Sequence, residues 1–299
     1  MTNRHRNLFL AASLFTYLLV TLGGVVCVTD ASRGCPDWPA CYGQLVPPPR
    51  FDSILEYTHR VVAALTSLLI VASAIVGWRR YRANRWLWQP LAIAIGFLLV
   101  VILLGALVVL RGLEPGLAAL DLGSALMVQA LVTTAAVVAA SRGRSPRRPS
   151  LAGGLARLAL WALVATWIVL VSGVLVAESG SAVRCLSWPL YGGEANPAVG
   201  QAREWLGWAR RVVGALAGIL ILAVVVQAWR AQGWQRGPRP VAAALGLVLV
   251  IEIVVGGVLA GGSGTLALQV VYVALAAALW PLLVALWVMA GLREPAASS

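Results

Sequence analysis

Eight long apolar runs constrain this chain more than any other feature of its sequence. They cover residues 8–28, 57–77, 88–110, 118–140, 157–177, 205–228, 240–260 and 265–288. A helix of about 20 apolar residues crosses a bilayer with all its backbone hydrogen bonds satisfied internally. Only 11% of the 299 residues are charged, whereas soluble domains carry about 25%. The sequence therefore predicts an all-α integral membrane protein with eight transmembrane helices, and it excludes a soluble enzyme, a disordered chain and a small disulfide scaffold.

The arginines predict how these spans are oriented. All 23 basic residues are arginine, and with 11 acids they give a net charge of +12. They cluster between apolar runs, which favours a topological signal over nucleic-acid binding. Fifteen of them would lie on one side of the membrane, beside one acid, Glu294: Arg4, Arg6, Arg79, Arg80, Arg82, Arg85, Arg142, Arg144, Arg147, Arg148, Arg157, Arg230, Arg236, Arg239 and Arg293. The positive-inside rule then predicts a multi-pass protein of the cell membrane with both termini cytoplasmic and with external loops at about 29–56 and 178–204.

The chain also repeats itself once. HRVVAALTSLLIVA from His59 matches RRVVGALAGILILA from Arg210, and CPDWPACYG from Cys35 matches CLSWPLYGG from Cys185. Each half holds four spans, so both halves run through the membrane in the same direction. We predict two tandem four-helix bundles, residues 1–140 and 157–299, in a parallel 4+4 repeat about an axis along the membrane normal. An arginine-rich cytoplasmic linker, residues 141–156, would join them.

Ionisable residues near the predicted outer face are the candidates for chemistry. Glu56 and His59 are three residues apart at the outer end of the second span, so they share a helical face. Such a pair can lie at the membrane interface without a function, but ionisable residues inside spans cost free energy and are commonly functional. Arg60 follows directly and could hold a carboxylate, including one on a ligand.

Three further residues occupy comparable positions on other spans. Asp121 lies near the outer end of the fourth span, Arg210 is the repeat equivalent of His59, and Tyr272 is the repeat equivalent of Asp121. All of them are predicted at about the same depth. A bundle in which His59 faces a residue of the fourth helix at matched depth has the arrangement of a two-ligand haem site.

Together, CPDWPAC, the following EYTHR, the eight spans and the 4+4 repeat resemble the haem A synthase family over nearly the whole chain. In that family each half carries a histidine pair on its second and fourth helices. The N-terminal pair receives the substrate, haem O, and the C-terminal pair holds a haem b that passes electrons. The resemblance implies oxidation of a porphyrin ring methyl group to a formyl group, with water as the oxygen source, to give haem A for terminal oxidases.

The resemblance also implies roles for individual residues. His59 would ligate the substrate iron, Glu56 would assist proton transfer at the methyl carbon, and Arg60 would position the ring or its propionates. Asp121 stands where the family has the facing histidine. It could hydrogen-bond an axial water, pair with Arg60 or orient His59.

The C-terminal half departs further from the family pattern, because Arg210 and Tyr272 replace both histidines. The only other histidine in the chain is His5, on the predicted cytoplasmic side, so no bis-histidine site can form within the chain. Arginine stays protonated and is not expected to ligate iron. Tyr272 could ligate haem iron as tyrosinate beside Arg210 or Arg211, or this half has lost its haem b and kept only the scaffold.

The chain has four cysteines. Cys35 and Cys41 are close together in a loop on the oxidising side, where a disulfide is expected. The family pattern also suggests this disulfide, and zinc ligation is disfavoured because no second ligand pair is nearby. Cys185 is expected to be free or intermolecular, and Cys27 to be a small packing residue. Glu252, in the middle of the seventh span, is expected to be protonated or paired inside its bundle.

These features predict a haem A synthase-like membrane oxidoreductase with at most one haem per chain, bound in the N-terminal half. Haem O synthase or oxidase assembly factors are candidate partners, and a homo-oligomer is open. The alternative is a catalytically degenerate haem-binding or oxidase-assembly protein of the same family. A transporter, which parallel repeats also permit, is disfavoured because no span is broken by glycine and proline at mid-membrane.

Overall fold

The structure, a computed structural model, describes residues 1–111, 114–141, 153–176, 200–230, 238–262 and 264–292. These residues form eight long helices and one short 3-10 turn. The long helices are α1 (Asn3–Val28), α2 (Phe51–Arg80), α3 (Arg85–Arg111), α4 (Pro115–Ala140), α5 (Gly154–Val176), α6 (Gly200–Arg230), α7 (Pro238–Ala260) and α8 (Leu266–Gly291). The 3-10 turn, η1, is Ala31–Arg33.

Each of the eight helices in the described residues is long and apolar enough to cross a membrane. Their lengths of 23 to 31 residues correspond to about 35–46 Å of helix, which exceeds the hydrocarbon thickness of about 30 Å. Each contains one of the eight apolar runs almost completely. The predicted fold class, an all-α membrane protein with eight transmembrane helices, is therefore confirmed.

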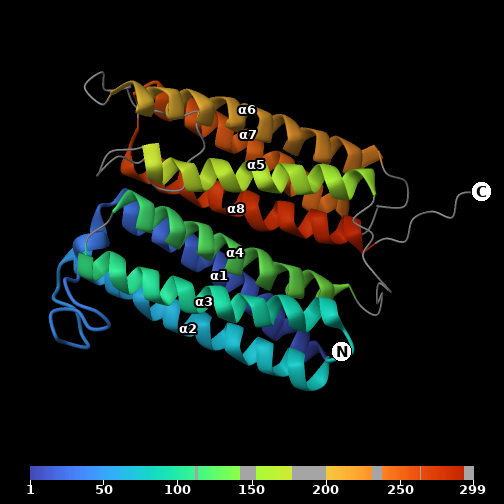
Figure 1. Cartoon of the computed structure of the whole chain (residues 1–299), viewed down its shortest axis with the longest axis horizontal. Coiled ribbons are helices and arrows are strands. Elements are labelled where there is room, and N and C mark those ends of the chain that lie inside the picture. The colour runs from blue at the N-terminus through green and yellow to red at the C-terminus, as the bar shows by residue number, and fades with distance from the viewer. Residues whose placement is uncertain (112–113, 142–152, 177–199, 231–237, 263, 293–299) are drawn as a thin grey trace, which may run out of the picture.

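The helices run side by side, with α1 to α4 packed together and α5 to α8 packed together (Figure 1). Within each set every helix contacts the next, and the first contacts the last. The two sets meet where α8 contacts α1 and α4 and where α4 contacts α5. These neighbours are compatible with the predicted pair of bundles, while the pseudo-two-fold relation and the boundaries at residues 140 and 157 stay predictions. Most of the predicted linker lies outside the described residues.

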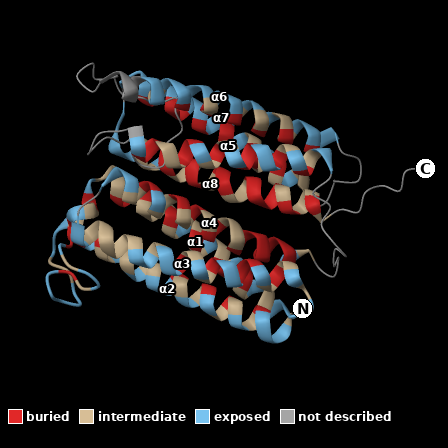
Figure 2. Cartoon of the chain, in the orientation of Figure 1, coloured by how far each residue is buried: buried red, intermediate tan, exposed pale blue. Residues whose placement is uncertain are grey.

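The centre of the molecule is formed by α4 and α8 (Figure 2). In their most apolar windows 61% and 56% of residues are buried, against 11% in α3, so α4 and α8 pack mainly on protein while α3 lies at the periphery. Trp280 of α8 donates a hydrogen bond to the Leu126 carbonyl of α4 at 2.8 Å. Tyr17 of α1 donates to the Ala274 carbonyl of α8 at 3.3 Å. These bonds join the two sets of helices directly.

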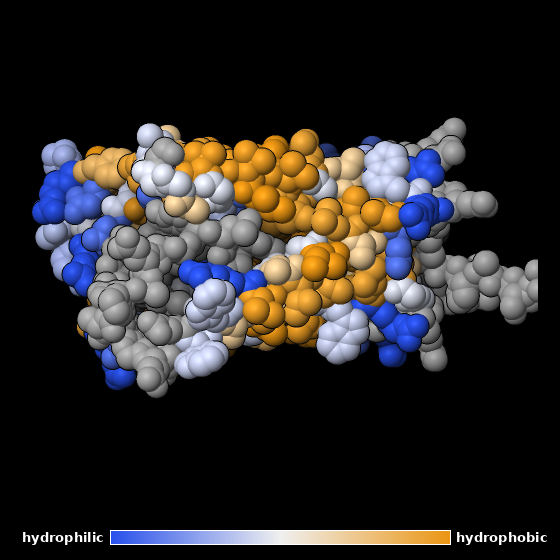
Figure 3. Space-filling view, turned by 90° about the horizontal axis from the view of Figure 1, so that it is seen from above, coloured by the Kyte–Doolittle hydropathy of each residue, from blue (hydrophilic) through white to orange (hydrophobic). Residues whose placement is uncertain are grey.

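The surface carries an apolar band between two more polar ends (Figure 3). The start of α1 and the end of α8 lie at one of these ends, and the loop between α1 and α2 lies at the other (Figure 1). At the end where α1 begins, the Arg82 guanidinium lies 4.4 Å from the centre of the Trp78 ring, which also packs edge-on against Trp88. Tryptophan and arginine together are typical of a membrane–water interface.

Candidate functional site

The candidate site begins at the outer end of α2, where Glu56, His59 and Arg60 lie in the second and third turns. The sequence placed the start of this span at residue 57, but the helix begins at Phe51 after the extended residue Arg50. Glu56 is therefore inside the helix and only 7% exposed. The Arg60 Nε donates to the Glu56 Oε1 at 3.1 Å, four residues along the same helix. Arg60 thus holds a carboxylate, as the sequence suggested, and that carboxylate belongs to the protein.

A disulfide hairpin, residues 34–44, covers this end of α2. Cys35 and Cys41 are bonded, which confirms the predicted disulfide, and both are almost completely buried. Cys41 and Gln44 exchange two backbone hydrogen bonds across Tyr42 and Gly43. Both turn residues have positive φ, 55° and 69°, as a type I′ turn requires. Glycine suits the second of these positions because it has no Cβ.

Asp37 stabilises this turn from inside the hairpin. Its two carboxylate oxygens accept the backbone N–H groups of Tyr42 at 2.6 Å and Gly43 at 2.7 Å. The hydrogen bond from Gly43 is the largest of the effects that hold the pKa of Asp37 below its ordinary value, and the nearby Arg60 charge acts in the same direction. Asp37 was not among the predicted site residues, although its position in CPDWP was a visible signal.

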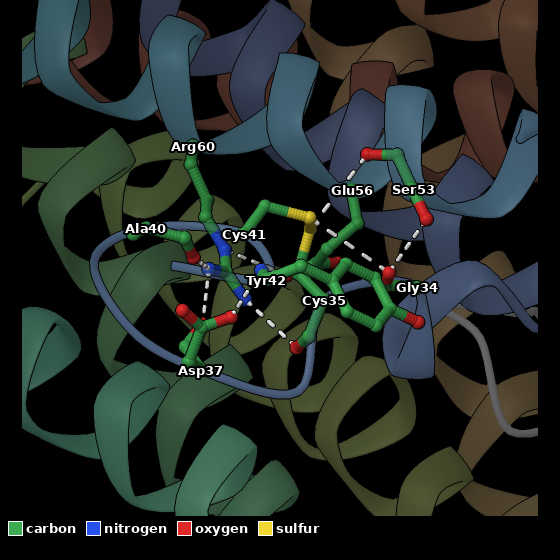
Figure 4. Close-up of polar contacts among 9 residues, drawn as sticks. All are labelled: Gly34, Cys35, Asp37, Ala40, Cys41, Tyr42, Ser53, Glu56 and Arg60. Carbon is green, nitrogen blue, oxygen red and sulfur yellow. Dashed lines mark hydrogen bonds and ion pairs between the residues drawn. A yellow bond between two sulfur atoms is a disulfide. The ribbon is translucent and has the colours of Figure 1, made fainter. Parts of the chain in front are cut away.

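The hairpin is fastened to α2 by two sets of contacts. The Ser53 hydroxyl donates to the Gly34 carbonyl at 2.7 Å, and Gly34 lies so close to the Asp52 backbone that a Cβ would collide with it. Arg60 supplies the other contacts (Figure 4): its Nη1 donates to the carbonyls of Asp37 and Ala40, both at 2.6 Å. Its Nη2 donates to the Cys35 carbonyl at 3.3 Å.

His59 lies against α1, where the chain has a glycine. A Cβ on Gly23 would be only 3.2 Å from the His59 Cε1, so the absence of a side chain makes room for the imidazole ring. The Nδ1 of His59 is buried and has no hydrogen-bond partner among the described residues. Gly23 was not among the predicted site residues either, because nothing in the chain's local pattern shows that it faces His59.

Two more buried polar atoms lie at a comparable depth in the same set of helices. The Asp121 Oδ1 of α4 and the Thr21 hydroxyl of α1 have no hydrogen-bond partner in the part of the chain that the structure describes. Arg60 donates to Glu56 and the hairpin, and His59 makes no hydrogen bond to Asp121. Of the three roles expected for Asp121, pairing with Arg60 and orienting His59 are therefore not seen in this structure.

The C-terminal helices place the remaining predicted residues differently. Arg210 of α6 is 5% exposed and donates from Nε to the Val169 carbonyl at 3.4 Å. Its charge also interacts with Tyr272 of α8, which is 2% exposed. Arg211 is exposed instead, and its guanidinium lies 5.1 Å from the centre of the Trp208 ring. Arg210 and Tyr272 are thus brought together in the interior, while Arg211 lies on the surface.

The two sets of helices meet next to these residues. Gly24 of α1 lies so close to the Val273 side chain of α8 that a Cβ on Gly24 would overlap it. Gly23 contacts His59 and Gly24 contacts Val273, so α1 separates His59 from the segment that contains Tyr272. The structure therefore does not bring His59 and Tyr272 into one pocket.

The remaining candidates from the sequence are Cys27, Cys185 and Glu252. Cys27 is disulfide-bonded, which corrects the expectation that it only fills space. Cys185 lies outside the described residues. Glu252 of α7 is fully buried, and neither of its carboxylate oxygens has a hydrogen-bond partner within the described ranges.

Comparisons with known proteins identify relatives of this chain. The profile of a family described as "Cytochrome oxidase assembly protein" matches residues 6–55 and 49–204, which include the hairpin, Glu56 and His59. A protein of Symbiobacterium thermophilum named "Heme A synthase" is 34% identical over 229 residues, 73% of each chain. A "Heme A synthase" of Exiguobacterium sibiricum is 29% identical over 221 residues, 73% of this chain and 72% of that protein.

Proposed function

The chain belongs to the haem A synthase family of cytochrome oxidase assembly proteins, and on this basis we propose that it oxidises the ring methyl group of haem O to the formyl group of haem A. It is a multi-pass membrane protein of haem A biosynthesis. The reaction joins the oxygen of one water molecule to the methyl carbon and releases four protons and four electrons, and the electrons pass to a separate electron acceptor. A site that performs it therefore needs a residue to hold the iron and a residue to accept protons.

One observation carries this proposal. His59 Nδ1, Asp121 Oδ1 and Thr21 Oγ1 are buried polar atoms without partners among the described residues. They come from α1, α2 and α4, of which α1 contacts the other two, and they lie about two turns from the helix ends on the hairpin's side. A buried polar group without a partner costs about 1–3 kcal/mol, so its persistence favours a ligand that contacts it. Glu56 lies one turn from His59 on the same helix.

In the proposed reaction these residues have distinct roles. His59 ligates the iron of haem O, since it is the only histidine at this end of the bundle. Asp121, on α4, holds a water molecule on the substrate. Glu56 accepts protons released at the reacting carbon, because a carboxylate in hydrogen-bond reach of a substrate or its water can act as a general base.

The C-terminal half does not fit a haem b held by two histidines. Arg210 stays protonated and donates to the Val169 carbonyl, and Tyr272 lies within range of its charge. We therefore assign haem binding to the N-terminal half only, with at most one haem per chain, and we derive no electron-transfer step through the C-terminal helices.

The arrangement of charges supports a cell-membrane location with both termini cytoplasmic. The start of α1 and the end of α8 lie at the same end of the molecule (Figure 1). Arg4, Arg79, Arg80 and Arg230 are exposed near this end. The disulfide hairpin lies at the opposite end, and disulfides persist on the oxidising side of a membrane.

The proposal is tested by extracting haem from the protein purified from cells that also make haem O. The unaltered protein should yield haem A. Glu56→Gln should keep bound haem O but form no haem A, because the carboxylate moves protons and does not ligate iron. His59→Ala should remove the haem, and Tyr272→Phe, the control in the other half, should retain it. A low-spin bis-histidine spectrum, or haem that survives His59→Ala and is lost with Tyr272→Phe, would contradict this assignment.

The replacement of the family's histidines favours a second function. Asp121, Arg210 and Tyr272 stand where the family has histidines, so the chain could hold haem for oxidase assembly without oxidising it. In that case the unaltered protein would carry unmodified haem O, and Glu56→Gln would change nothing in the extracted pigment. The same haem extraction therefore separates the two functions.

A further inference from the structure

Arg60 is almost enclosed by protein oxygen atoms. Its side chain is 11% exposed, and four oxygens accept hydrogen bonds from its three nitrogens. One acceptor is the Glu56 carboxylate and the other three are carbonyls of the disulfide hairpin (Figure 4). A guanidinium has five N–H groups, so most of this donor capacity is already used inside the protein. Arg60 is therefore poorly placed to bind the propionates of a porphyrin.

The acceptors of Arg60 belong to two different elements. Glu56 lies on α2, while the carbonyls of Cys35, Asp37 and Ala40 come from the hairpin, 20 to 25 residues before Arg60 in the chain. The planar fork of a guanidinium fixes the relative positions of the groups it binds. The position of the Glu56 carboxylate therefore depends on the position of the hairpin, and Arg60 transmits this dependence.

The hairpin itself is a stiff unit. Its ends are joined by the Cys35–Cys41 disulfide, and the Asp37 carboxylate closes its turn through the backbone of Tyr42 and Gly43. Apart from the bonds to Arg60, the described residues show one hydrogen bond between the hairpin and α2, in which the Ser53 hydroxyl donates to the Gly34 carbonyl. A stiff hairpin that loses its bonds to Arg60 would move away from Glu56 as one body.

We propose that Arg60 is a positioning residue, which fixes the Glu56 carboxylate beside His59 by clamping the disulfide hairpin over the outer end of α2, and that it does not contact the substrate. This inference rests on the proposed function for the role of Glu56. The clamp itself is a property of the folded protein and can be measured without catalysis.

The clamp is tested by the rate at which a membrane-impermeant phosphine reduces the Cys35–Cys41 disulfide, followed by alkylation and mass spectrometry. Arg60→Gln should speed the reduction at least about tenfold, because three charge-assisted hydrogen bonds are lost. Arg60→Lys should have an intermediate effect, since an ammonium cannot span all four acceptors. Arg50 offers a matched control: it is an arginine of the same loop in an exposed ion pair with Asp52 at 2.8 Å. Arg50→Gln should change the rate by about twofold at most.

The effect on Glu56 is tested by kinetics with haem O. Arg60→Gln should lower kcat by about tenfold to a hundredfold, because a displaced catalytic group loses its orientation, while KM and bound haem change by about twofold at most. A raised KM with an unchanged kcat would show that Arg60 binds the substrate and would overturn the inference. Unchanged disulfide protection in Arg60→Gln would also overturn it. If Arg60→Gln does not accumulate in the membrane, both measurements are made on Arg60→Lys instead.

A failure of the proposed function gives a different pattern. If the unaltered protein forms no haem A, the proposed function is wrong. The clamp is then tested by disulfide reduction together with labelling of Glu56 by a hydrophobic carbodiimide. Arg60→Gln should then increase both, because such a reagent modifies carboxyl groups released from ion pairs, while Arg50→Gln should increase neither. Labelling of Glu56 that is equal in Arg60→Gln and the unaltered protein would reject the positioning role.

Discussion

At the residue scale, the candidate site depends on two glycines of α1 as well as on residues with functional groups. Gly23 and Gly24 are consecutive on α1, yet they serve different neighbours. Gly23 leaves space for the His59 ring and Gly24 leaves space for Val273. Because neighbouring residues on a helix point in directions about 100° apart, one pair of glycines lets α1 approach α2 and α8 at the same level.

The space at Gly23 leads to a prediction about haem binding. In Gly23→Ala the new Cβ would lie 3.2 Å from the His59 Cε1, so the ring must shift by a few tenths of an ångström. We expect a weaker hold on haem and a changed visible spectrum, while helix content and expression stay the same. Titration of the purified protein with haem measures this.

Gly96→Ala is the control for that experiment. A Cβ on Gly96 would meet nothing within 4 Å, and alanine favours a helix by about 1 kcal/mol over glycine. This variant should bind haem as the unaltered protein does. Equal haem affinity in Gly23→Ala and Gly96→Ala would mean that His59 does not depend on the space at Gly23.

At the scale of elements, the hairpin and the contact between α1 and α8 depend on different interactions. The hairpin is built from local contacts: a disulfide, a two-residue turn and the Asp37 carboxylate. Its attachment to α2 is not local, because it depends on Arg60 and Ser53. The hairpin can therefore stay intact and still detach.

Asp37 makes the hairpin sensitive to acid. The pKa of Asp37 is lower in the folded protein, mainly because of the hydrogen bond from Gly43. A group whose pKa falls on folding stabilises the fold above its ordinary pKa, about 3.9 for aspartate, and this contribution is lost as the pH falls through the lowered value. We expect disulfide protection in the hairpin to be constant from neutral pH down to about pH 4 and to decrease below it. In Asp37→Asn the protection of the disulfide should be lower and should not depend on pH in this range. If protection still decreased in acid in Asp37→Asn, another group would be responsible for the acid response.

The contact between α1 and α8 can be tested by compensating substitutions. Gly24→Ala places a methyl group where the Val273 side chain already lies, and overpacking of this kind costs about 1–3 kcal/mol. We expect a lower midpoint of thermal unfolding in detergent. Gly24→Ala combined with Val273→Ala should recover most of the loss, because the second change removes the overlapping atoms. A double variant no more stable than Gly24→Ala would show that the two residues are not in contact.

At the scale of the whole molecule, the polar surface lies at two ends (Figure 3). The start of α1, the end of α8 and many arginines lie at one end, and the disulfide hairpin lies at the other (Figure 1). The apolar band between them (Figure 3) provides the surface that lipid covers. In such an arrangement the hairpin and the outer ends of α1, α2 and α4 share one side of the membrane.

This division predicts the topology in cells. A protease-cleavable tag at either terminus should be cut in inside-out vesicles and protected in right-side-out vesicles, because the arginine-rich end stays in the cytoplasm. A tag inserted after Gly43, at the hairpin turn, should give the opposite result and serves as the internal control. Cleavage of terminal tags in right-side-out vesicles would reverse the assigned orientation.

The eight spans, the Cys35–Cys41 disulfide and the family all follow from the amino-acid sequence alone. Hydropathy belongs to each residue separately, and a helix in lipid satisfies its backbone within its own segment, so no distant contact is needed to place it. Cys35 and Cys41 are close in the chain, and the compartment favours their oxidation. The motifs CPDWPAC and EYTHR are likewise continuous stretches, so the family resemblance that they carry does not depend on how the helices pack.

Which groups meet one another depends instead on tertiary packing. The sequence suggested a substrate carboxylate as one partner of Arg60, whereas the structure gives Glu56 and three hairpin carbonyls. The fold also places Arg210 beside Tyr272 and leaves Arg211 on the surface, although the two arginines are neighbours in the chain. A charged side chain in an apolar interior binds whichever acceptors come within hydrogen-bond distance, and that distance is set by the packing of helices and loops far apart in the sequence.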